Sequence, residues 1–268
     1  MNIYFNLAQA QRYHSLSQRA RALTEAWMAE QMFCPHCGCE TLDHLANNLP
    51  AADFTCPQCH AIYELKSSKH AVGRKIVNGA YDTLIERITS LRNPDLFVLT
   101  YHPQAWCVEE LWLIPRNFFV PAIVEQRPPL SARARRAGWV GSYILFSQIP
   151  EQGRICLLRN RKPEHREEIL RRMRQADALA TETLPKRRWL LDVLTCVNQM
   201  PARAFTLAEL ARFEPWLTAR HPNNQHILPK LRQQLQVLRD RGLLAFLGRG
   251  RYQRLGPPPT AEGRPSRA

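Results

Sequence analysis

Apolar residues recur at helical spacing in three segments of the first two thirds of the chain. Residues 6–33 combine helix-forming residues with apolar positions about 3.6 apart, which predicts helices. Residues 75–91 show the same period and predict another helix, and residues 160–180 predict a basic one. One side of the helix expected at 75–91 carries Ile76, Ala80, Leu84 and Ile88.

Patterns typical of strands lie between these helical segments. Residues 61–67 are rich in β-branched and aromatic side chains, and residues 51–54 can end the strand before them. Residues 95–101 and 109–115 also predict strands. Because strands and helices are mixed along the chain, we expect an α/β core around a central sheet.

The last third of the chain predicts a second, smaller domain. Residues 180–187 are expected to form a linker, and Thr206 and Glu209 have the spacing of a helix capping box. Helices are expected at 189–200, 205–210 and 221–244, followed by two short strands around Gly248, Arg249 and Gly250. This order is that of a winged helix-turn-helix. The expected parts are an α/β domain, a winged-helix domain and a disordered Pro-rich tail, at 1–182, 183–255 and 256–268.

The net charge indicates a polyanionic partner. The chain has 37 basic and 23 acidic side chains, which gives +14, and lysines and arginines bind phosphates with release of counterions. A cationic surface that serves only solubility is the alternative.

No apolar run reaches the roughly 18 residues of a membrane span, and the first residues lack a signal-peptide pattern. We therefore expect a cytosolic protein that does not contact membranes, in which the eight cysteines are reduced.

Four of these cysteines have the spacing of a zinc site. Cys34, Cys37, Cys56 and Cys59 form two C-x2-C pairs separated by eighteen residues. Four thiolates close a tetrahedral shell and leave no position for water, so the expected Zn²⁺ is structural. A redox dithiol is the rival for either pair alone. Cys39 is expected to be a spectator, and Cys107, Cys156 and Cys196 are expected to be small core residues. The neighbouring histidines are expected to be exposed or hydrogen-bonded rather than ligands, namely His36, His44 and His60.

Charged residues surround the second cysteine pair. Glu64 and Lys66 lie on one face of the strand expected at 61–67, because alternate residues share a face. If Asp53 lies on the paired strand, the two carboxylates converge beside the Lys66 ammonium. With the Leu65 carbonyl they suit Mg²⁺, which binds oxygen ligands and phosphates. The alternative is a surface ion pair. Glu25 could also reach this point, although a solvated helix face is the simpler interpretation.

Further basic residues are candidates for DNA contacts. In the loop after residue 127, Trp139 lies between Gly138 and Gly141 on a mobile basic segment, where it can stack on a base or instead cap the core. The candidates in this loop and in the winged helix are Arg133, Arg135, Arg136, Trp139, Asn223, Asn224, His226, Lys230, Arg232, Gln233, Gln234, Arg249 and Arg251. The third helix of a winged helix enters the major groove, and the wing meets the backbone.

The order and spacing of several stretches closely resemble the DpnI family of methyl-directed type II restriction endonucleases. They include "ADFTCPQCHAIYELKS", "IVNGAY", "ARRAGWVG", "FTLAELARFE", "RQQLQVLRD" and "GRGRY". The resemblance implies a PD-(D/E)xK nuclease core with a structural zinc and a C-terminal winged helix. By it, Asp53, Glu64 and Lys66 match the catalytic motif, and Trp139 matches the tryptophan that engages the methylated site. Ala52 replaces the consensus proline, and "PNNQHI" is one residue longer than the family pattern.

The expected function is therefore Mg²⁺-dependent cleavage of double-stranded DNA at GATC sites with N6-methylated adenines, by a monomer. The resemblance also implies that both domains recognise the methylated site. One rival is a reader of methylated DNA that binds without cutting. Another is a repair nuclease that recognises DNA structure instead of sequence.

Overall fold

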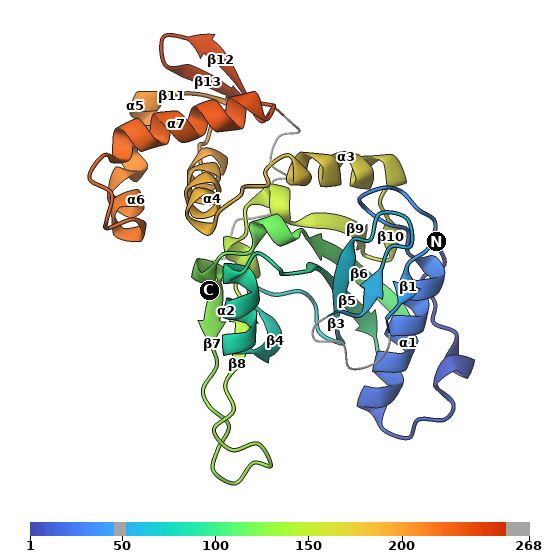
Figure 1. Cartoon of the computed structure of the whole chain (residues 1–268). Coiled ribbons are helices and arrows are strands. Elements are labelled where there is room, and N and C mark those ends of the chain that lie inside the picture. Colours follow the sequence, from blue (N-terminus) through green and yellow to red (C-terminus); the bar gives the residue numbers. More distant parts are fainter. Residues whose placement is uncertain (46–51, 256–268) are drawn as a thin grey trace. The chain divides into compact units, whose positions relative to one another are not determined.

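The structure is a computed structural model that describes residues 1–45 and 52–255. It divides into two compact units, Met1–Ala180 and Thr181–Ala268, which are coloured along the chain in Figure 1. The expected tail at 256–268 lies outside the described residues. Within the described ranges, no helix is both long enough and apolar enough to cross a membrane.

The first unit is built on a seven-stranded mixed sheet of order β1-β2-β3-β5-β6-β9-β10. Only β3 and β5 are parallel to each other, and every other neighbouring pair is antiparallel. The strands are β1 (Asp43–His44), β2 (Phe54–Thr55), β3 (Ile62–Ser68), β5 (Asp95–His102), β6 (Cys107–Ile114), β9 (Ile155–Arg159) and β10 (Lys162–Pro163). The strands expected at 61–67, 95–101 and 109–115 are thus confirmed as β3, β5 and β6.

Helices α1 and α3 pack against β3 and β9 of this sheet, respectively. The core includes the fully buried aromatic side chains of Phe54, Tyr63 and Phe97, and the Tyr63 and Phe97 ring centroids are 5.0 Å apart. The helices and 3-10 turns are η1 (Leu7–Ala10), α1 (Leu16–Gln31), α2 (Tyr81–Thr89), η2 (Arg116–Phe118), η3 (Pro121–Ile123), η4 (Phe146–Gln148), η5 (Glu151–Gly153) and α3 (Arg166–Asp177). The helices expected in 6–33 and 160–180 are confirmed.

The expectation of one helix over 75–91 is wrong for its first part. Residues Ile76–Ala80 form strand β4, and α2 begins only at Tyr81. β4 pairs with β8 (Gly141–Ile144), which also pairs with β7 (Val124–Gln126), so the three strands make a small second sheet. The partner strand lies more than sixty residues away in the sequence. Local periodicity could not reveal it, and tertiary pairing overrides the helical pattern here.

The second unit has the element order of a winged helix. Its helices are α4 (Leu184–Asn198), α5 (Leu207–Leu210), η6 (Ala211–Phe213), α6 (Glu214–Arg220) and α7 (Ile227–Asp240). Its sheet has the order β11-β13-β12, with β11 (Ala204–Thr206), β12 (Leu244–Gly248) and β13 (Arg251–Arg254). The capping box of Thr206 and Glu209 is present, and β12 and β13 confirm the expected strands.

Three details of this unit differ from the expectation. The linker is shorter, because Thr183 caps α4 and the helix begins at Leu184. Helix α6 and strand β11 were not expected. Helix α7 begins at Ile227 rather than at 221, because the segment before it forms a turn in which the amide of Asn224 donates to the carbonyl of His221.

Candidate metal centre and acidic cleft

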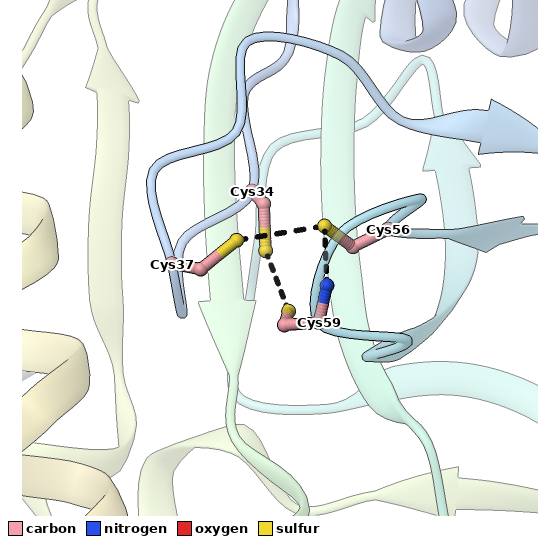
Figure 2. Close-up of side chains that lie close together, drawn as sticks. All are labelled: Cys34, Cys37, Cys56 and Cys59. Atoms are coloured by element: carbon pink, nitrogen blue, oxygen red, sulfur yellow. Dashed lines mark hydrogen bonds between the residues drawn. The ribbon is translucent and has the colours of Figure 1, made fainter.

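The four cysteines of the two C-x2-C pairs converge on one point of the first unit. Figure 2 shows the side chains of Cys34, Cys37, Cys56 and Cys59 facing one another. All four Sγ atoms lie within 4.8 Å of one another, and the Cys34–Cys59 and Cys37–Cys56 pairs are each 3.5 Å apart. A tetrahedral zinc shell with bonds of about 2.3 Å puts its sulfurs about 3.8 Å apart. The cluster therefore has the size of a four-thiolate metal site, and Cys39 lies outside it.

Both knuckles have the same turn. The amide of Gly38 donates to the carbonyl of Cys34 at 2.8 Å, and the amide of His60 donates to that of Cys56 at 3.0 Å. The residue after the second cysteine has a positive φ in each case, +80° at Gly38 and +58° at His60. The second knuckle is the connection between β2 and β3, so it forms the turn of this hairpin.

The protein environment disfavours ionisation of the clustered thiols when no cation is bound. Burial raises the pKa of Cys59, and its hydrogen bonds to the other three thiols raise it further. A bound cation stabilises the thiolates and releases their protons. Four sulfur donors in this shell fit Zn²⁺, and the closed shell would make the ion structural.

His36 ties the first knuckle to the sheet and to α3. Its Nε2 lies 2.7 Å from Asp95 Oδ2, and its Nδ1 lies 2.9 Å from Asp177 Oδ2. Burial lowers the pKa of His36, but the hydrogen bonds to Asp177 and Asp95 outweigh it and raise the pKa to about 10. The imidazole is therefore a cation held between two carboxylates. The expectation of a hydrogen-bonded histidine is confirmed.

Replacement of His36 should destabilise the first unit. Asp95 is fully buried. His36→Ala therefore leaves the Asp95 carboxylate without its imidazole partner at a position that water does not reach. Breaking a buried pair in this way costs about 3 kcal/mol or more. We expect a lower denaturant midpoint for His36→Ala with zinc retained, and no change for the control His70→Ala, which alters an exposed side chain. Equal midpoints for the two variants would contradict the bridging role.

The charged residues around the second knuckle line one cleft. Asp53 directly precedes β2, and the register that pairs Phe54 with Tyr63 places Asp53 opposite Glu64. The Asp53 amide donates to the Tyr63 carbonyl at 2.9 Å, and its Oδ2 accepts a hydrogen bond from the Leu65 amide at 2.7 Å. The cleft has a volume of about 420 Å³ and is lined by Arg21, Thr24, Glu25, Asp53, Glu64, Leu65, Lys66 and Ser67.

Glu64 is the most enclosed of these acids. Its side chain is 7% exposed, and its two oxygens face Lys66 Nζ at 2.6 Å and Arg87 Nη2 at 3.5 Å. Lys66 remains one third exposed, so its ammonium is accessible from the cleft. The structure thus brings together Asp53, Glu64 and Lys66 from two neighbouring strands.

Helix α1 contributes a second charged pair to the cleft. Arg21 Nε lies 2.6 Å from Glu25 Oε1, and His44 Nε2 lies 3.4 Å from Glu25 Oε2. The hydrogen bond to Glu25 raises the pKa of Arg21, and the charge of Asp53 adds to it. The simpler expectation of a solvated face for Glu25 is wrong, because α1 packs against β3 and directs this acid into the cleft. No sequence pattern indicated that Arg21 lines the cleft.

The basic loop joins β7 to β8 and extends away from the small sheet in Figure 1. Arg133, Arg135 and Arg136 are exposed, and Trp139 is half-buried. The Arg136 guanidinium carbon lies 4.8 Å from the centroid of the Trp139 ring. The loop therefore presents a cationic tip above a partly covered indole.

The winged-helix candidates divide by exposure. Gln234 is 6% exposed on the face of α7 that carries the buried Leu231 and Leu235. It therefore cannot reach a base edge, and this assignment is wrong. Gln236 was not among the residues expected to contact DNA, but its side chain is exposed. It follows Gln233 by three residues and Arg232 by four, so the three side chains lie on one face of α7. The other candidates are exposed or half-exposed, namely Asn223, Asn224, His226, Lys230, Arg232, Gln233, Arg249 and Arg251.

A mixed α/β unit with a thiol cluster and a charged cleft, followed by a helix-turn-helix unit, indicates a DNA-binding protein. Residues 1–182 match the sequence profile of the Dam-replacing family, DpnI. Residues 185–254 match that of the Dam-replacing HTH domain, DpnI_C. The chain therefore belongs to the DpnI family of methyl-directed restriction endonucleases.

Proposed function

We propose that this protein is a Mg²⁺-dependent type II endonuclease that cuts double-stranded DNA at GATC sites carrying N6-methyladenine. The observation that carries the proposal is the meeting of Asp53, Glu64 and Lys66 in one cleft of a chain that belongs to this family. The division into a nuclease domain at 1–182 and a winged-helix domain at 183–255 is part of the proposal.

The element order around the cleft supports a PD-(D/E)xK core. Helix α1 precedes the β2–β3 hairpin that holds the three charged residues, and α2 then leads to β5, which is parallel to β3. The motif thus lies at the start of β2 and on β3, two antiparallel neighbours that are the second and third strands of the mixed sheet. Backbone hydrogen bonds between the two strands place residues 53 and 64 opposite each other, and the Leu65 amide holds the Asp53 carboxylate.

The donor set of the cleft fits Mg²⁺. Asp53, Glu64 and the Leu65 carbonyl are hard oxygen donors, and the remaining positions of the ion would be left to water and phosphate. Bound there, Mg²⁺ would polarise the scissile phosphodiester and lower the pKa of a water molecule.

The protein's own groups have separate tasks in this proposal. The hydrogen bond from the Leu65 amide orients the Asp53 carboxylate. Lys66 and Arg87 hold Glu64 in position from two sides. The Lys66 ammonium orients the attacking water and offsets charge on the phosphorus. Arg21 adds positive charge at the cleft wall, where it can attract the DNA backbone.

Adenine methylation is readable from the major groove, because N6 lies on that edge of the base. One buried methyl is worth only about 1 kcal/mol, which is too little for strong discrimination. Recognition of both methyl groups, by the loop of the first unit and by the winged helix, would multiply the selectivity. The exposed stripe of Arg232, Gln233 and Gln236 on α7 supports a major-groove role for that helix.

The rival is a reader of methylated DNA that does not cut. We would compare duplexes that share one GATC site and carry no methyl, N6-methyladenine or 5-methylcytosine. We expect cleavage of the N6-methyladenine duplex alone, and only with Mg²⁺. Equal cleavage of methylated and unmethylated duplexes would remove the methyl specificity, and selective binding without cleavage would establish the reader.

A further inference from the structure

Gly141 and Trp139 are two residues apart at the base of the basic loop, and Gly141 is the first residue of β8. A Cβ atom added at Gly141 would lie 2.9 Å from both Cζ3 and Cη2 of the Trp139 indole. Real Cβ atoms essentially never approach another heavy atom so closely. The indole can therefore occupy its position only because residue 141 has no side chain.

The backbone of Gly141 cannot move to relieve such a contact. Its carbonyl accepts a hydrogen bond from the Arg127 amide at 2.9 Å, and it pairs with Ala80 of β4 on its other side. The preceding carbonyl, of Val140, accepts from the Tyr81 amide at 3.1 Å. Residue 141 is thus fixed between β4 and the end of β7.

The backbone of Trp139 is also fixed. Its amide donates to the Arg136 carbonyl at 3.1 Å, and its carbonyl accepts from the Leu130 amide at 3.0 Å. Gly138 before it has φ +76°, which only glycine adopts without strain. With both backbones held, a side chain at residue 141 would have to turn the indole itself. Arg127 Cδ would also lie 3.2 Å from the new atom, but that flexible side chain can yield.

We infer that Gly141 is a positioning residue that sets the direction of the Trp139 indole for recognition of methylated DNA. The role in recognition of methylated DNA rests on the proposed function, whereas the steric role of Gly141 does not. The two glycines near Trp139 therefore have separate structural roles, whereas the sequence led us to expect only a mobile segment. Gly138 allows the turn, and Gly141 provides the surface on which the indole lies. The Arg136 guanidinium covers the ring from the loop, so the indole is held in one orientation before DNA arrives, which lowers the entropic cost of binding.

The test is a double-mutant cycle with a matched glycine. Gly79 lies in the neighbouring strand β4, and a Cβ added there would meet nothing within 4 Å. The proteins are the wild type, Gly141→Ala, Trp139→Ala, the double variant and the control Gly79→Ala. For each, the ratio of cleavage rates on methylated and unmethylated duplexes is measured together with the denaturant midpoint of unfolding.

We expect Gly141→Ala to reduce the cleavage ratio by about 10-fold or more, since small misplacements of a contacting group have effects up to about 100-fold. Gly79→Ala should leave the ratio unchanged. In the Trp139→Ala background, Gly141→Ala should have no further effect on the ratio or on the midpoint, because the indole is no longer there to be displaced.

A wild-type ratio in Gly141→Ala, or an equal loss with and without Trp139, would overturn the inference. The second result would mean that alanine merely disturbs the small sheet. A wild-type enzyme with no preference for methylated DNA would instead refute the proposed function. The unfolding cycle, which needs no DNA, would then still show whether Gly141 seats Trp139.

Discussion

Lys66→Ala should abolish cleavage and leave DNA binding nearly intact. The Lys66 ammonium is the cationic group that lies 2.6 Å from Glu64 and remains accessible from the cleft. Loss of one group that stabilises charge in the transition state costs about 10²- to 10³-fold in rate, and loss of the group that orients water adds to this. We therefore expect at least a 10³-fold lower single-turnover rate on methylated duplex.

The fold should tolerate this substitution. Arg87 remains 3.5 Å from the other oxygen of Glu64, so the acid does not become an isolated buried charge. Lys69→Ala is the matched control, because Lys69 lies just beyond β3 and is exposed. It should cut at the wild-type rate. Near wild-type cleavage by Lys66→Ala would remove Lys66 from the chemistry.

Cys56→Ser should lose zinc, the hairpin and both activities. Cys56 is fully buried, its Sγ accepts a hydrogen bond from the Cys59 amide, and it lies in the turn that joins Asp53 to Glu64. Structural zinc in small domains contributes about 10–16 kcal/mol of binding free energy. This is as large as the free energy of unfolding of an ordinary domain, about 5–15 kcal/mol, so loss of the zinc should unfold the hairpin. We expect a zinc content near zero, a lower unfolding midpoint and neither binding nor cleavage.

Cys39→Ser provides the control for this effect. Cys39 lies two residues beyond Cys37 and outside the thiol cluster, so this variant should keep its zinc and cut normally. A stable, zinc-free Cys56→Ser protein that still cuts would show that the knuckle does not support the cleft.

These two sites could be predicted from the sequence because their information is local. The x2 spacing of each cysteine pair specifies a knuckle, and the alternation of β3 places Glu64 and Lys66 together. The position of Asp53 beside Glu64 could be predicted on the single assumption that the two strands form a hairpin. The pairing of Phe54 with Tyr63 confirms that hairpin.

The remaining features depend on contacts between distant segments. Glu25 and Arg21 reach the cleft because α1 packs on β3, and β4 is a strand because β8 pairs with it. Gln234 and Gln236 differ only in the face of α7 on which they lie, and that face is set by how the helix packs in its domain. The steric role of Gly141 required the position of the Trp139 ring.

The most direct measurement of the central claim uses one plasmid prepared with and without adenine methylation at GATC. The purified protein and its Asp53→Asn variant are incubated with both forms in Mg²⁺. We predict discrete cutting of the methylated plasmid by the wild type alone, with the unmethylated plasmid intact. Reduced mobility of the methylated plasmid without cutting by the wild type would contradict the catalytic assignment of Asp53, Glu64 and Lys66.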